Sequence, residues 1–197
     1  MDRTRKQNSN KKNQSKRKWV NYTKARRNNR YQKIKKVIEK AQTNPLTKSD
    51  IISTLGSQNN FLGVFSSDEL GSLRLLSHPV FLIVNVDVSS LPGSHWLAIR
   101  IGKCRIELFD SLGFKPDLWG AYPKYLLKFL GRYLTSHKFM HTPVLQPRFT
   151  HSCGLFCIYF IIFRQFLSFS NCVARFSFNL FDNNARLFFM LKKFYLK

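Results

Sequence analysis

Acidic side chains are scarce in this chain of 197 residues. Ten Asp and Glu stand against 33 Lys and Arg, so the formal net charge is +23. The excess is concentrated at the start, where residues 1–40 hold sixteen Lys and Arg but only Asp2 and Glu39 as acids. A basic charge this large and this uneven indicates a polyanionic partner.

Cysteine is also scarce, and long apolar runs are missing. Four cysteines in a chain of this length do not resemble the disulfide framework of a small secreted domain, so we expect a reducing compartment. The longest apolar stretch, residues 154–169, contains Arg164 and Gln165 and is shorter than the roughly 20 residues of a membrane span. We expect this stretch to be a core helix, and we expect no membrane partner.

A second pair of metal ligands is missing as well. Cys153 and Cys157 are four residues apart and His151 is close to them, but no further CxxC or HxxxH pair accompanies them. We therefore expect no metal site and no cofactor of the protein's own. Cys157, Cys172 and Cys104 are better interpreted as ordinary thiols.

Residues 1–43 contain many Lys, Arg, Asn and Gln, and show no sustained apolar periodicity before KIKKVIEKA. Such a segment cannot bury enough surface to offset its ordering entropy, so we expect a disordered tail with nascent helix at most near residues 31–42. The folded domain is expected over residues 44–197. The tail residues that we expect to contact nucleic acid are Lys11, Lys12, Lys16, Arg17, Lys18, Arg26 and Arg27. A nuclear import signal is the alternative role of this tail.

The remaining sequence predicts an α+β fold. NPLTKSDIISTLG predicts a short helix that begins after Thr47 or Ser49 and ends at Gly56, and residues 57–73 are expected to form a loop. β-branched runs then predict three antiparallel strands, followed by helices separated by a short extended piece, TPVLQPR. The strands are expected at residues 80–88, 95–101 and 105–111, and the helices at 118–134, after Cys153, and from Asn183 or Asn184 to the end.

Two polar residues lie at the ends of neighbouring predicted strands. His95 opens the second strand and Asp110 ends the third. Strands joined by a tight turn lie about 4.8 Å apart, which brings the start of one beside the end of the next. We therefore expect direct contact, in which the carboxylate would orient the imidazole and stabilise its cation.

Cys153 stands at the start of the apolar helix, where the helix dipole and a nearby imidazolium favour a thiolate. Gly154 next to it would let a carbonyl group approach the backbone, so the Cys153 N–H could bind an oxyanion. Gln146 is the only Gln or Asn between Asp110 and Cys153, which makes its amide the candidate second donor. Each of these residues alone has an ordinary structural interpretation, and a buried Cys in an apolar helix is most often part of the core.

The segments GSHWLAI, LFDSLGF and QPRFTHSCGLF together resemble the adenovirus-type maturation cysteine proteases (adenain) and, more distantly, the SUMO-specific cysteine proteases. The resemblance runs from about residue 47 to the C-terminus. Asp110 matches the SUMO proteases, whereas adenain has Glu there. Proteases of Polinton/Maverick-type elements and related viruses mix the two patterns, and this chain is placed among them.

The resemblance implies a papain-like fold with permuted order. It implies Cys153 as nucleophile, His95 as general base, Asp110 as orienting acid and Gln146 as oxyanion donor. It also places Trp96 close to the catalytic site, although a core position suits Trp96 equally well. Gly154 is the second residue expected to contact substrate.

The implied function is maturation of capsid or core precursors by cleavage after small residues, in the virion and host nucleus, by a monomer. DNA is the expected activator. An activating peptide would lack the family's disulfide, because no cysteine lies between Asp110 and Cys153. The alternatives are a SUMO- or ubiquitin-like isopeptidase and an inert nucleic-acid-binding or virion structural protein. Removal of residues 1–43 is expected to weaken DNA binding and to spare peptide hydrolysis.

Overall fold

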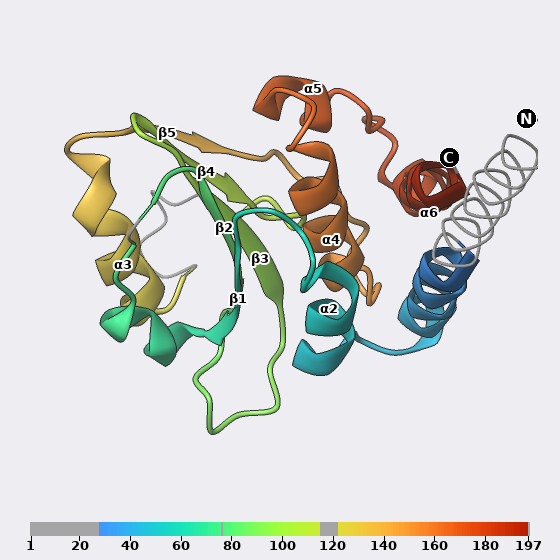
Figure 1. The fold of residues 1–197 in the computed structure, drawn as a ribbon, viewed down its shortest axis with the longest axis horizontal. Helices are drawn as coiled ribbons and strands as arrows, with labels where there is room; N and C mark the ends of the chain where they lie inside the picture. Colours follow the sequence, from blue (N-terminus) through green and yellow to red (C-terminus); the bar gives the residue numbers. More distant parts are fainter. Residues whose placement is uncertain (1–27, 76, 115–121, 197) are drawn as a thin grey trace, which may run out of the picture.

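The computed structural model describes residues 28–75, 77–114 and 122–196. The tail residues from Lys11 to Arg27 lie outside this range. Within the described residues, five strands form one sheet with helices on both faces, which confirms the predicted α+β class (Figure 1). The strands are β1 (Phe61–Ser66), β2 (Val80–Asn85), β3 (Trp96–Ile101), β4 (Arg105–Phe109) and β5 (Lys138–His141). The helices are one over residues 28–43, α2 (Lys48–Leu55), the 3-10 helix η1 (Ser67–Ser72), α3 (Lys124–Leu134), α4 (Cys153–Phe163), α5 (Phe169–Val173) and α6 (Leu180–Leu196).

The centre of the sheet is the antiparallel meander that the sequence predicts. β2 pairs with β3 and β3 with β4, and every residue of β2 is buried. The two edges were missed: β1 pairs parallel with β2, and β5 pairs parallel with β4. The sequence of β1 does not predict a strand, because its apolar and polar residues do not alternate. The structure shows a register shift between Phe61 and Gly63 in the pairing of β1 with β2. β5 has four residues, none fully buried, and lies upstream of the extended piece that was predicted.

The sheet divides the core into two layers because successive side chains of a strand point to opposite faces. Phe81 and Ile83 of β2 belong to the cluster that includes α2 and α4. Val80, Leu82 and Val84 belong to the cluster that includes α3. Figure 1 shows the same separation, with α3 on one side of the sheet and α2 and α4 on the other.

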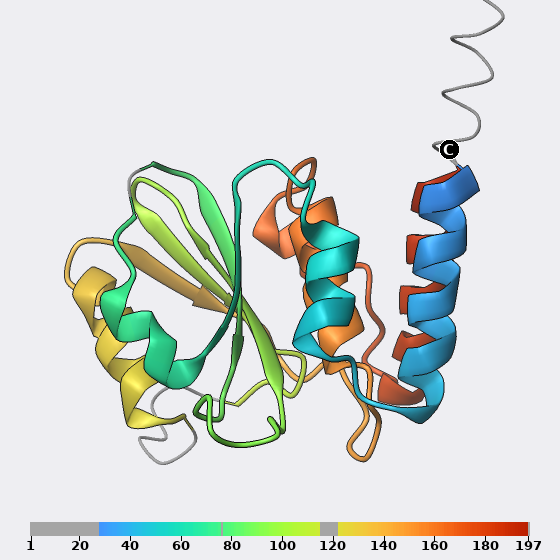
Figure 2. The same cartoon turned by 60° about the horizontal axis from the view of Figure 1, so that its bottom comes forward.

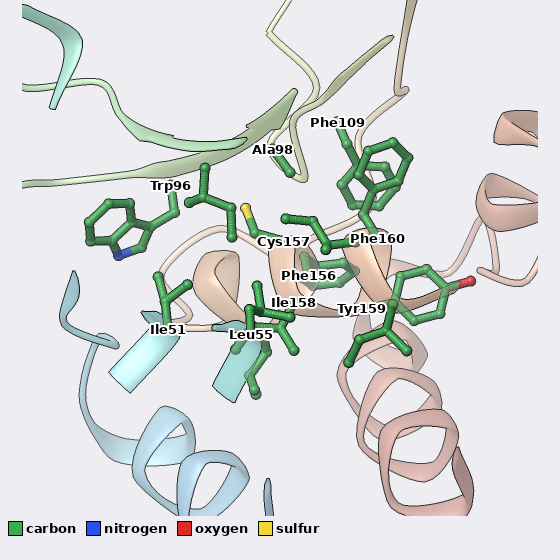
Figure 3. Packing of buried hydrophobic residues seen from close by; sticks show 14 of the residues in the cluster. Ile51, Leu55, Trp96, Ala98, Phe109, Phe156, Cys157, Ile158, Tyr159 and Phe160 are labelled. Carbon is green, nitrogen blue, oxygen red and sulfur yellow. The ribbon is translucent and has the colours of Figure 1, made fainter. Parts of the chain in front are cut away.

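α4 is the central helix of the larger layer. All of its residues except Phe163 are buried, as expected for a helix that is apolar on every side. Phe160 stacks on Phe109 of β4 with 4.6 Å between ring centroids, and Cys157 points toward the sheet near Ala98 (Figure 3). The prediction of a core helix with Cys157 in the core is confirmed. In the described residues, no helix combines the length and apolar content needed to cross a membrane.

The helix over residues 28–43 corrects the predicted domain boundary. Ile34 and Ile38 are fully buried in the same cluster as Leu187 and Leu191 of α6. Figures 1 and 2 both show this helix beside α6. Its apolar residues recur at helical spacing among the lysines and so form one stripe, but their partner lies at the other end of the chain. The folded part therefore begins upstream of Asn44.

The predicted cap of α2 is present, whereas the predicted start of α6 is not. Thr47 caps α2 and shares a capping box with Asp50, as the sequence indicates. α6 begins at Leu180, before the asparagines that were expected to start it. Asn183 is instead buried, where it donates to the Leu145 carbonyl over 2.8 Å and accepts from the Ser177 N–H over 2.7 Å.

The N-terminal helix can be tested by truncating one side chain. Ile38→Ala should lower the free energy of unfolding by about 2–5 kcal/mol, because the side chain is fully buried. Lys36→Ala on the exposed face of the same helix should change it by less than about 0.5 kcal/mol. Urea denaturation measures both values. Equal effects of the two substitutions would show that this helix does not pack on the core.

Candidate active site

The sheet and α4 bring three of the predicted residues together. His95 directly precedes β3 and its carbonyl accepts from the Val86 N–H, which extends the β2–β3 pairing by one step. Asp110 directly follows β4, and Cys153 is the first residue of α4. The antiparallel pairing of β3 with β4 brings the start of one beside the end of the other, as predicted. His95 and Cys153 are 6% exposed and Asp110 is 1% exposed.

The predicted contact between His95 and Asp110 is present. His95 Nε2 lies 2.7 Å from Asp110 Oδ1. The Leu112 N–H donates to the same oxygen, while the Phe114 N–H and the Tyr122 hydroxyl donate to Oδ2. Burial alone would raise the pKa of this carboxyl, but the hydrogen bonds from His95, Tyr122 and Leu112, together with the charge of His95, hold its pKa below the usual value. Asp110 is therefore a carboxylate with donors on both oxygens.

Thr142 fixes the backbone of Asp110. Its hydroxyl accepts from the Asp110 N–H over 2.9 Å and donates to the Asp110 carbonyl. Thr142 directly follows β5, so the last strand of the sheet supports the site. The carboxylate is thus held through its side chain and its main chain.

His95 is held as a cation. Burial by itself would lower its pKa, but hydrogen bonds and charge interactions with Asp110 and Cys153 outweigh burial and raise the pKa to about 9. Nε2 bonds Asp110, so Nδ1 is the ring nitrogen left to interact with the Cys153 thiol. The imidazole therefore lies between a carboxylate and a cysteine, an arrangement that can pass a proton to and from sulfur.

Cys153 lies at the positive end of the α4 dipole. The N-cap residue Ser152 makes no side-chain hydrogen bond to the first turn of α4. Backbone N–H groups of that turn have no partner within the helix and are oriented toward its start. Together with the imidazolium of His95, this is the setting in which cysteines act as nucleophiles.

Gln146 is 2% exposed and its amide is held at both ends. Oε1 accepts from the Ser111 hydroxyl over 2.7 Å, and Nε2 donates to the Thr150 carbonyl over 2.8 Å. An amide nitrogen carries two N–H groups. The second N–H of Gln146 has no hydrogen-bond partner among the residues that the structure describes.

The two residues predicted to contact substrate, Trp96 and Gly154, both pack against Leu46. A Cβ at position 154 would lie 3.1 Å from Leu46 Cβ, so the glycine there allows close packing on Leu46. That Gly154 also lets a substrate carbonyl approach stays a prediction. Trp96 is 9% exposed, belongs to the cluster with Ile51 of α2 and donates Nε1–H to the Leu46 carbonyl over 2.8 Å (Figure 3).

Sequence reasoning missed four residues that support the site: Ser111, Tyr122, Thr142 and Leu46. Ser111 could have been found from the sequence, because it directly follows Asp110 within the segment FDSLG. The others had none, because each reaches the site from a segment with no recognisable motif.

The described residues contain no group of three His, Cys, Asp or Glu side chains placed to bind a metal ion. Burial raises the pKa of Cys157 well above its usual value, which keeps that thiol neutral and a poor ligand. Cys172 is fully buried, and Cys104 is exposed.

No protein-family model matches the chain. In sequence it is similar to the protease of Ovine adenovirus D serotype 7 (isolate OAV287), with 29% identity over 123 residues, which cover 57% of this chain and 60% of the relative. The resemblance to adenovirus-type proteases is thereby confirmed. The chain spans less than two thirds of the length of that relative.

Two solved structures are similar to this chain at low sequence identity. The ASFV pS273R protease has a TM-score of 0.41 and 21% identity, covering 57% of this chain and 43% of that chain. The SUMO protease Ulp1, with its catalytic cysteine oxidised to a sulfenic acid, has a TM-score of 0.41 and 12% identity, covering 80% of this chain and 83% of that chain.

The contact of Cys153 with His95 can be tested by titration. Because the pKa of His95 is raised from 6.5 to about 9, NMR of its ring carbons should show the cation persisting until the pH approaches 9. Cys153→Ala should lower this pKa, since Cys153 is one of the groups that raise it. Cys157→Ala, one helical turn away, should leave it unchanged.

The same shift predicts a pH dependence of stability. Because the pKa of His95 is higher in the folded than in the unfolded protein, protonated His95 stabilises the fold. This contribution is fully present below pH 6.5 and is lost as the pH rises through about 9. Cys153→Ala should make that loss smaller in urea denaturation series. An unchanged titration in Cys153→Ala would mean that the thiol does not reach the imidazole.

Proposed function

We propose that this protein is a cysteine endopeptidase with Cys153 as nucleophile, His95 as general acid and base, and Asp110 as the residue that orients His95. The observation that carries the proposal is the buried His95–Asp110 pair placed against the N-terminus of α4. The sequence similarity to an adenovirus protease supports the same chemistry.

The residues perform the reaction in two halves. The thiolate of Cys153 attacks the peptide carbonyl carbon, and the resulting oxyanion accepts hydrogen bonds from Gln146 Nε2–H and the Cys153 N–H. His95 gives its proton to the leaving amine, which breaks the C–N bond and leaves a thioester. Neutral His95 then takes a proton from water, which attacks the thioester and releases the carboxylic acid and the thiolate.

The substrates proposed are viral or element-encoded capsid or core precursors, cut after small residues such as Gly-Gly or Gly-Ala. The basic residues 1–40 supply a phosphate-binding segment, so DNA is the proposed second partner and activator, and its affinity would fall with salt. The virion and host nucleus are the proposed locations, and a monomer is the proposed state.

A direct test compares cysteine variants of the full chain on a fluorogenic peptide that carries Gly-Gly before the cut. Cys153→Ala should reduce kcat by at least about a thousandfold, because the nucleophile is removed. Cys104→Ser, an exposed thiol, should leave kcat within about twofold. Hydrolysis that survives in Cys153→Ala would overturn the proposal.

Two further measurements separate the alternatives. Reaction of Cys153 with a SUMO C-terminal vinyl electrophile, without cleavage of capsid precursors, would indicate an isopeptidase. A Cys153 that iodoacetamide does not label near neutral pH, read by mass spectrometry, would indicate an inert protein.

A further inference from the structure

Ser111 connects Asp110, its neighbour in the chain, with the Gln146 amide. It directly follows Asp110, and it is 1% exposed. Its hydroxyl donates to Gln146 Oε1 over 2.7 Å, and its carbonyl accepts from the Leu145 and Gln146 N–H groups, each over 2.8 Å. One residue therefore holds Gln146 by both its side chain and its main chain.

These bonds determine which way the Gln146 amide faces. The oxygen and nitrogen ends of an amide have nearly the same shape, so only hydrogen-bond partners distinguish them. The Thr150 carbonyl can only accept, which requires Nε2 on that side. Oε1 then faces Ser111, whose hydroxyl must donate to it. In this orientation the second N–H of Gln146 remains free to donate.

Loss of the Ser111 hydroxyl would remove the one donor that the structure gives to Oε1 among the described residues. A buried oxygen without a donor is costly, so the amide would gain other orientations. A flipped amide would present its oxygen, rather than an N–H, to the developing negative charge and would repel it. The backbone bonds from Leu145 and Gln146 would remain, because they use the Ser111 carbonyl.

We propose that Ser111 is a positioning residue that fixes the Gln146 amide with an N–H directed at the oxyanion of the tetrahedral intermediate. The inference rests on the proposed function, because it assigns a role within that reaction. It also couples the two halves of the site, since Thr142 and Asp110 fix the backbone from which Ser111 acts.

The test is a double-mutant cycle on the full chain with the fluorogenic Gly-Gly peptide. Gln146→Ala should lower kcat about a hundredfold, as loss of an oxyanion donor does. Ser111→Ala should lower kcat about tenfold with KM within about twofold, since the oxyanion exists only after attack. In the double variant, Ser111→Ala should cause no further loss, because the amide that it positions is gone.

Ser67→Ala is the matched control. Ser67 is fully buried on η1, and its hydroxyl has no partner among the described residues. Its removal should leave kcat unchanged. If Ser111→Ala does not fold, Ser111→Cys, with a weaker donor of similar shape, replaces it in the same cycle and should lower kcat by less than tenfold.

Iodoacetamide separates this inference from the proposed function. Alkylation of Cys153 forms no oxyanion, so Ser111→Ala should react at the wild-type rate. A wild-type kcat in Ser111→Ala, or a loss that adds fully to that of Gln146→Ala, would overturn the role of Ser111 while leaving the protease intact. Hydrolysis that persists in Cys153→Ala would overturn the proposed function itself.

Discussion

The buried carboxylate of Asp110 is the constraint on which the site depends. A charge at 1% exposure is stable only if enough donors replace the water it has lost. Two backbone N–H groups, one hydroxyl and the His95 imidazole supply them, and they come from the loop after β4, from residue 122 and from the start of β3. The raised pKa of His95 then follows in part from this anion.

A second buried cluster of charges lies on β4, the strand that Asp110 follows. Glu107 of β4 is fully buried, where Arg164 donates to both of its oxygens and Arg100 of β3 to one. Arg164 directly follows α4, whereas Cys153 begins it. The end of α4 is therefore attached to the sheet by an ion pair, that of Arg164 with Glu107.

The sequence predicted those features that local patterns determine. The β2–β4 meander, the capped α2, the core helix and the His95–Asp110 contact follow from alternation, turn residues and short sequence separation. β1, β5 and the helix over residues 28–43 were missed because each depends on a partner that local patterns do not show. The close packing of Gly154 was missed for the same reason: its neighbour there is Leu46, more than a hundred residues upstream.

Leu46 links the basic N-terminal segment to the active site. It comes three residues after the helix over residues 28–43, its carbonyl binds the Trp96 indole, and its side chain packs against Gly154. Trp96 and Gly154 are the direct chain neighbours of His95 and Cys153. Removal of residues 1–43 would expose the apolar face of α6 and free the segment that holds Leu46 in place. The expectation that this truncation spares hydrolysis assumes that residues 1–43 do not pack on the folded domain. Residues 28–43 do pack on it, in the same layer of the core as Cys153, so their removal should also disturb the active site.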